Sequence, residues 1–134
     1  MTAQLRVGVD LCAADDVADA IDRFGDRYLE RIYTPHERAS CTGQPERLAA
    51  RFAAKEATVK VLRPEAEGID LRSIEIQRQP GGWCEVHLAG HAAELADRAG
   101  IGSLAVSISH DRGLATAVVI AQAHPTAPTH GGQA

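Results

Sequence analysis

The chain has 134 residues, of which 45% are hydrophobic and 24% are charged, with a formal net charge of −4 at pH 7. That length fits one compact domain, and the acidic balance argues against a nucleic-acid binder, which usually carries a basic excess. No apolar run approaches the ~18 residues that span a bilayer, and we expect no secretory signal in Met1–Leu5. Three cysteines without a CxxC pair predict reduced thiols in a cytoplasmic protein.

The first predicted element is a strand, because apolar and other residues alternate from Leu5 to Cys12 with a period of two. Its apolar face carries Leu5, Val7, Val9 and Leu11. Asp10 lies on the opposite face, two residues from Gly8, and a glycine there lets another group approach that face closely.

A helical pattern follows from Asp15 to Tyr33, and Gly25 is expected to divide it. Arg23, Arg27 and Arg31 fall one turn apart and form a basic stripe. This stripe is either a solvated helix face or a docking surface for an acidic partner. Thr34 to Glu37 then form a capping box, with proline at the first helical position.

The remaining predicted elements are two helices, each followed by a pair of strands. A second helix is expected from Glu46 to Leu62, followed by a hairpin of two short strands around the turn at Gln79–Gly82. A short helix ends near Gly100, and two strands follow at Leu104–His110 and Leu114–Ala121. This pattern predicts one domain over residues 1–122 and a disordered tail over residues 123–134.

The second helix carries the most informative charges. Lys55 falls on the apolar stripe made by Leu48, Phe52 and Val59. A charge on an inward face costs several kcal/mol unless it is paired or bound to a ligand, so Lys55 is expected either to bind a ligand or to form a structural salt bridge. Glu56 lies beside it, one turn before Lys60; these two residues could also form a plain surface pair.

Asp10 and Glu56 are expected to meet where this helix packs on the first strand. Two carboxylates with open positions suit Mg²⁺, which takes oxygen ligands and tends to share a substrate phosphate. Lysines beside them would offset phosphate charge. The sequence therefore predicts a metal-assisted phosphate site.

Other polar groups give weaker signals. Ser107 to His110 place two serines on one strand face, but adjacent strand residues point to opposite faces, so His110 is poorly placed to deprotonate Ser109. The group is either a polar strand end or part of a ligand site. His87 and His91 straddle Gly90, which disfavours helical zinc geometry, and no cysteine has a nucleophile signature.

Three segments of the chain resemble the signatures of a known family. They are Gly8-Val9-Asp10-Leu11, then Arg51-Phe52-Ala53-Ala54-Lys55-Glu56-Ala57 with Lys60, and finally Ser107-Ile108-Ser109-His110. Their order and spacing are similar to those of 4′-phosphopantetheinyl transferases of the small holo-acyl-carrier-protein synthase type. The resemblance runs from about residue 5 to residue 121.

The resemblance implies an α+β fold, with a small antiparallel sheet packed on a long helix, and a homotrimer with active sites at the subunit interfaces. It implies transfer of phosphopantetheine from coenzyme A to a serine of an apo acyl carrier protein, releasing adenosine 3′,5′-bisphosphate. Asp10 and Glu56 would hold Mg²⁺, and Lys60 would contact phosphate or assist proton transfer. The residues expected to help bind coenzyme A are Arg51, Lys55, Lys60, Ser109 and His110.

The chain departs from the family pattern after the first signature. Ala13 and Ala14 replace an acidic and an aliphatic residue, and Asp16 stands where the family usually has the arginine of its carrier-docking helix. Asp16 would repel an acidic carrier, although the basic stripe can compensate. We therefore hypothesise an active transferase with an unusual carrier, such as one from secondary metabolism. The alternatives are a non-catalytic homologue that binds coenzyme A or a carrier, and an unrelated α+β oligomer with a structural role.

Overall fold

The computed structural model describes residues 2–66 and 68–124 of the chain. The elements follow one another as β1 (Gln4–Ala13), α1 (Ala14–Phe24), α2 (Asp26–Ile32), α3 (Pro35–Cys41), α4 (Pro45–Leu62), the short 3₁₀ helix η1 (Leu71–Ser73), β2 (Ile74–Arg78), β3 (Cys84–Leu88), α5 (Gly90–Ala99), β4 (Leu104–Asp111) and β5 (Leu114–Ala123). The fold class is α+β, as predicted.

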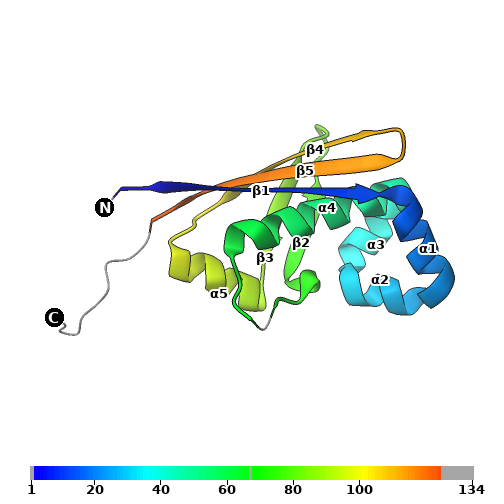
Figure 1. Ribbon diagram of the computed structural model, residues 1–134, viewed down its shortest axis with the longest axis horizontal. Coiled ribbons are helices and arrows are strands. Elements are labelled where there is room, and N and C mark those ends of the chain that lie inside the picture. The colour runs from blue at the N-terminus through cyan, green and yellow to red at the C-terminus, as the bar shows by residue number, and fades with distance from the viewer. Residues whose placement is uncertain (1, 67, 125–134) are drawn as a thin grey trace.

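The main sheet has three antiparallel strands in the order β1-β5-β4. β1 pairs with β5 along its whole length, from Gln4 opposite Ala123 to Ala13 opposite Leu114. Helix α4 lies along one face of this sheet (Figure 1). The α4 residues that allow this close packing are small and at most 5% exposed: Ala49, Ala50, Ala53, Ala54 and Ala57.

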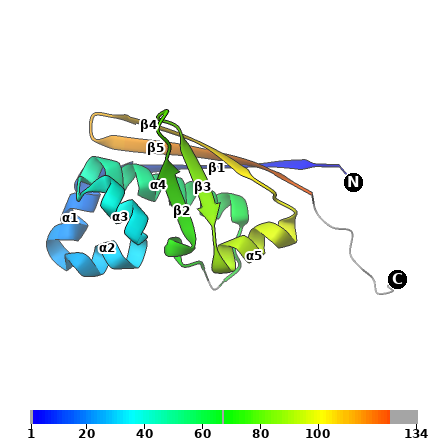
Figure 2. The same cartoon turned by 180° about the vertical axis from the view of Figure 1, so that it is seen from behind.

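A second sheet, the antiparallel hairpin β2–β3, crosses below the main sheet and carries α5 at its end (Figure 2). Ile74 and Ile76 of β2 are fully buried together with Val61 of α4. The core therefore lies between the main sheet, α4 and this hairpin. At the far end, the His124 amide donates to the Gly100 carbonyl at 3.2 Å, which ties the end of β5 to α5.

The structure confirms the helix boundaries predicted at Gly25 and at the Thr34 capping box. Gly25 separates α1 from α2 with φ of +57°, a conformation that glycine adopts without strain. The capping box at the start of α3 has both of its bonds: the Glu37 amide donates to Thr34 Oγ1 at 3.2 Å, and the Thr34 amide donates to Glu37 Oε1 at 3.0 Å. No helix among the described residues is both long and apolar enough to cross a membrane.

The predicted end of the domain comes slightly too early. β5 continues through Ala123, which is fully buried, so the strand passes the expected boundary at residue 122. Residues 125–134 of the predicted tail lie outside the described residues.

The two faces of β1 are used differently from what its polarity pattern implies. The polar face, with Gly8 and Asp10, packs toward α4, whereas the apolar residues on the other face are exposed. They are 53–72% exposed and lie beside two apolar residues of β5. We call this surface the outer sheet face; it consists of Leu5, Val7, Val9, Leu11, Val118 and Ile120.

Candidate active site

A close contact between β1 and α4 brings the two predicted carboxylates together. A Cβ atom on Gly8 would lie 2.1 Å from the carbonyl oxygen of Ala57 and 3.1 Å from Cβ of Lys60. Only glycine allows the helix backbone to come this near the strand. The close approach predicted at Gly8 is therefore confirmed, and it places Glu56 and Lys60 of α4 over Asp10 of β1.

Lys60 bridges the helix and the strand. Its Nζ donates to the Val9 carbonyl at 2.7 Å and lies 3.5 Å from Oδ1 of Asp10. The Lys60 side chain remains 54% exposed. Its charge is therefore only partly used by the protein and remains accessible to an anionic ligand.

Glu56 has few internal partners. No ion pair or side-chain hydrogen bond joins it to another described residue. Burial raises the pKa of Glu56, the neighbouring charge of Asp10 raises it further, and Lys60 opposes both effects. Two carboxylates thus repel each other at a site where one cation only partly compensates them.

The donor set fits a metal ion shared with a substrate. Asp10 and Glu56 offer hard oxygen ligands, and the described residues contain no cluster of three or more acidic, histidine or cysteine ligands. Mg²⁺ is commonly bound through one or two carboxylates together with waters and substrate phosphates. Asp10 and Glu56 are thus suited to such an ion but not to a complete protein cage.

A separate pocket of 630 Å³ is lined by three arginines and a histidine. Helix α4 contributes Arg47 and Arg51 to it, the hairpin contributes Arg78, and β4 contributes His110. Glu46 is the one carboxylate among its described lining residues. The arginine ion pairs found in the described part of the chain involve other residues, namely Arg38, Arg72 and Arg98.

Arg51 is the most constrained of these cations. It is only 5% exposed, and its Nη2 donates to Ser40 Oγ at 3.3 Å. Its Nε is buried and has no partner among the described residues. An unsatisfied buried donor is costly, so a guanidinium held at this pocket is suited to an anionic ligand such as a phosphate.

One chain does not bring all predicted site residues into a single cavity. Arg51 and His110 line the pocket, whereas Asp10, Glu56 and Lys60 are not among its lining residues. Ser109 is exposed and pairs with Thr116, while its neighbour His110 turns toward the pocket. The single chain therefore carries two separate half-sites, one cationic and one carboxylate-bearing.

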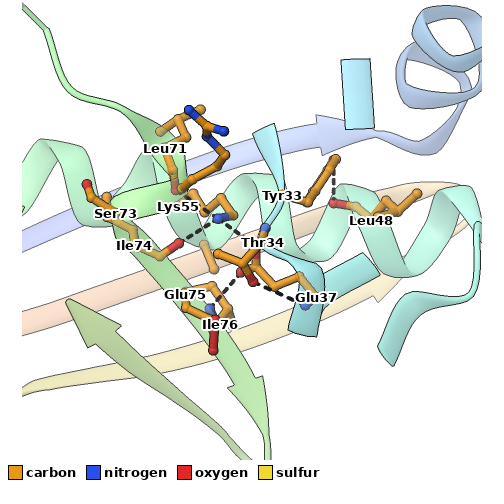
Figure 3. A network of polar contacts seen from close by, with 12 residues as sticks. Tyr33, Thr34, Glu37, Leu48, Lys55, Leu71, Ser73, Ile74, Glu75 and Ile76 are labelled. Carbon is orange, nitrogen blue, oxygen red and sulfur yellow. Dashed lines mark hydrogen bonds and ion pairs between the residues drawn. The ribbon is translucent and has the colours of Figure 1, made fainter. Parts of the chain in front are cut away.

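Lys55 lies in neither half-site. It is fully buried, and its Nζ lies 2.6 Å from Oε1 of Glu37 and donates to the carbonyls of Leu71, at 2.8 Å, and Ile74 (Figure 3). Burial lowers the pKa of Lys55 and Glu37 opposes that effect. Of the two roles that the sequence left open, the structure shows the salt bridge. Direct contact with coenzyme A is not supported, because no part of the side chain reaches the surface.

Sequence reasoning missed three residues of this region. Glu37 was predicted only as a helix cap, although a lysine on an inward stripe requires a carboxylate partner. Arg47 lies one turn before Arg51 on α4, a spacing that was available in the sequence. Arg78 reaches the pocket through the hairpin, and no local pattern indicates that.

Cys12 and Cys41 are not suited to nucleophilic catalysis. Burial, followed by the charge of Asp10, raises the pKa of Cys12 to about 11. Its thiol is therefore protonated near neutral pH and is a poor nucleophile. Burial likewise raises the pKa of Cys41.

Comparison with known proteins identifies the family. The family model for the 4′-phosphopantetheinyl transferase superfamily matches residues 6–119. A holo-acyl-carrier-protein synthase of Desulforudis audaxviator is 42% identical over 120 residues, which cover 87% of this chain and 92% of that protein. The synthase of Halothermothrix orenii is 35% identical over 119 residues, covering 87% of this chain and 95% of that protein.

Solved structures agree with this assignment. The crystal structure of the Helicobacter pylori holo-acyl-carrier-protein synthase in complex with coenzyme A has a TM-score of 0.77 and 32% identity. The match covers 86% of this chain and 98% of that one. The chain belongs to the 4′-phosphopantetheinyl transferase superfamily.

Proposed function

We propose that this chain transfers 4′-phosphopantetheine from coenzyme A to a serine of an apo acyl carrier protein, with Asp10 and Glu56 as the ligands of Mg²⁺. The observation that carries the assignment of residues is the pairing of two under-satisfied carboxylates with Lys60, in a chain that also has an arginine-lined pocket. One half-site would hold the metal ion, and the other is suited to a ligand rich in phosphate.

The chemistry needs positioning and charge neutralisation more than a protein nucleophile. The attacking hydroxyl belongs to the carrier, which agrees with the high pKa of Cys12. Mg²⁺, when bound, would neutralise charge on the pyrophosphate and orient it. Lys60, held by the Val9 carbonyl, would place a second positive charge beside the reacting phosphate. Arg51 and His110 would hold the nucleotide end of coenzyme A.

The protein is further proposed to be a homotrimer with composite active sites. Within one chain the cationic pocket lacks the carboxylates, so a second copy would complete it. The outer sheet face exposes large apolar side chains on neighbouring strands. Contiguous apolar patches of this kind mark association surfaces, and a head-to-tail contact that closes on itself gives a ring.

Mixing inactive chains tests the composite site. Glu56→Gln and Arg51→Ala chains, each inactive alone, are co-refolded at equal amounts. If each site takes its carboxylates from one copy and its pocket from the next, about a quarter of the sites in random oligomers contain both intact halves. No recovered turnover, together with an unchanged oligomer by light scattering, would contradict the shared site.

Charge on α1 and α2 bears on the choice of carrier. Asp16 is exposed on α1, and the residues of the basic stripe are exposed along the same helical region. We propose that the partner is a carrier other than a standard fatty-acid carrier, such as one from secondary metabolism. Asp16→Arg should then raise the rate on a standard carrier; equal rates for the variant and the parent would count against this proposal.

The proposed location is the cytoplasm. The described cysteines are free, and Cys12 and Cys41 are buried as thiols. This agrees with a reducing compartment.

Intact-protein mass spectrometry is the direct test of the reaction. The chain, coenzyme A and Mg²⁺ are incubated with a panel of apo carriers, with and without a chelator. We expect a carrier to gain the mass of one phosphopantetheine only when Mg²⁺ is free. Binding of coenzyme A without mass gain on any carrier would instead support a non-catalytic binding protein.

A further inference from the structure

The arginine-lined pocket has walls from three separate elements of the fold. Helix α3 contributes Ser40, helix α4 contributes Arg51, and the β2–β3 hairpin contributes Arg78. No sheet hydrogen bonds or continuous helix connect these walls. The short turn after Cys41 joins the first two walls, and the buried ion pair of Glu37 and Lys55 contacts all three elements.

The Lys55 side of this pair joins α4 to the segment that leads into β2. Its ammonium group has three acceptors: Glu37 Oε1, the Leu71 carbonyl and the Ile74 carbonyl. An ammonium group has three protons to donate, so its bonding capacity is used in full. Lys55 also lies one turn after Arg51 on the same side of α4.

The Glu37 side joins α3 to the hairpin. Oε1 accepts from the Thr34 amide at 3.0 Å, and Oε2 accepts from the Ile76 amide at 2.7 Å (Figure 3). Glu37 lies three residues before Ser40, whose Oγ accepts from Arg51. Ile76 lies two residues before Arg78 on the same strand. The bond to Ile76 thus fixes the strand that carries Arg78, and Glu37 itself belongs to the helix that carries Ser40.

The pair is closed to solvent, since both side chains have an exposed fraction of 0%. A buried ion pair is weak evidence for stability by itself, because apolar residues of similar size often stabilise a fold equally well. A fully satisfied polar network in a low-dielectric interior does fix geometry. The contacts of this pair therefore indicate that it fixes the relative positions of the pocket walls rather than adding to the stability of the fold.

We propose that Glu37 and Lys55 are positioning residues that align the three walls of the coenzyme A pocket without touching the ligand. This inference rests on the proposed function, which assigns coenzyme A to that pocket. It gives Lys55 an indirect role in coenzyme A binding.

Glu37→Gln is the main test. In either orientation the NH2 group of the new amide faces a donor, either the Ile76 amide or Lys55 with the Thr34 amide, so one link of the network is lost. Misplacement of binding groups on the scale of an ångström costs on the order of ten- to a hundredfold. We expect KM for coenzyme A, and its Kd by calorimetry, to rise by at least about tenfold, with KM for the carrier unchanged. The matched control is Glu94→Gln on exposed α5.

A purely structural pair gives a different result. A loss of stability that leaves the chain folded under the assay conditions leaves both KM values and the Kd for coenzyme A unchanged; that outcome would overturn the proposal. Where Glu37→Gln does not fold, Glu37→Leu/Lys55→Met is measured by the same criteria, because it leaves no lone buried charge. Calorimetry separates the two proposals. A parent chain that binds coenzyme A but modifies no carrier refutes the proposed function and still allows the pair to be judged.

Discussion

Lys55 and Glu56 are neighbours on α4, yet the fold treats their charges in opposite ways. Lys55 is fully buried and has a partner for every proton. Glu56 is half-buried, has a carboxylate neighbour in Asp10 and has no described hydrogen bond to relieve it. The first charge is fully compensated inside the protein, whereas the second is left available to a cation.

The difference separates two functions along one helix. A saturated charge adds rigidity, and replacing it disturbs the fold. An unsatisfied pair of carboxylates destabilises the free protein slightly and is relieved by a ligand. Substitutions at the two positions should therefore give crossed effects on turnover and stability.

The largest effect is expected for Glu56→Gln. Loss of one metal ligand should reduce turnover on the order of 10²- to 10³-fold, measured by mass spectrometry of the carrier. Because the pKa of Glu56 is raised in the folded chain, ionisation of this group opposes folding. The melting temperature of metal-free Glu56→Gln should thus equal or exceed that of the parent. Glu65→Gln, in an exposed loop, is the control; turnover within twofold of it would refute the metal assignment.

Lys55→Met should act mainly on stability and on coenzyme A binding. It leaves Glu37 as an unpaired buried charge, which typically costs about 3–5 kcal/mol. Urea unfolding followed by circular dichroism measures this loss. A urea unfolding curve that coincides with that of the parent would show that the Glu37 carboxylate is accommodated without Lys55, which would contradict the proposed contrast with Glu56.

Gly8→Ala tests whether turnover and stability both depend on the close packing of α4 against β1. The added methyl would meet the Ala57 carbonyl, so the helix must move away from β1. Overpacking of this kind costs about 1–3 kcal/mol, and the same shift should separate Glu56 from Asp10 and slow turnover. Gly102→Ala, where an added Cβ atom has no atom within 4 Å, serves as the matched control. Turnover and stability equal to those of the parent would show that α4 does not need this contact.

The smallest effect is a change in the titration of Glu56, followed by NMR in the metal-free protein. Asp10→Asn removes a like charge and should lower the pKa of Glu56, whereas Lys60→Met removes an opposite charge and should raise it. A protonated carboxyl does not bind metal, so metal affinity should fall with decreasing pH at a higher pH than for an ordinary glutamate. Equal titration curves in the parent and both variants would place the three groups too far apart to interact.

Local signals in the sequence predicted most of the fold. The break at Gly25, the capping box at Thr34 and the hairpin turn at Gln79–Gly82 depend on residues within a few positions of one another. The meeting of Asp10 with Glu56 was also predicted, because Gly8 marks where a helix can approach the strand.

Two features depend on long-range packing and could not be predicted. Alternation in β1 suggests that the apolar face is a buried one, yet Leu5, Val7 and Val9 on that face are more than half exposed in the single chain. The partner of Lys55 is 18 positions away, in a different helix, where Glu37 also serves as a cap. Because the capping box already accounts for Glu37, the sequence gives no sign that the same carboxylate also pairs with Lys55.

The alanines of α4 restrict how this protein can be altered. Positions 49, 50, 53, 54 and 57 are packed so closely that a larger side chain at any of them would shift the helix that carries Arg51 and Glu56. Variation on α1 and α2, whose polar residues are largely exposed, leaves that helix in place. Libraries for directed evolution of new carrier preference should therefore vary α1 and α2 and keep α4 constant.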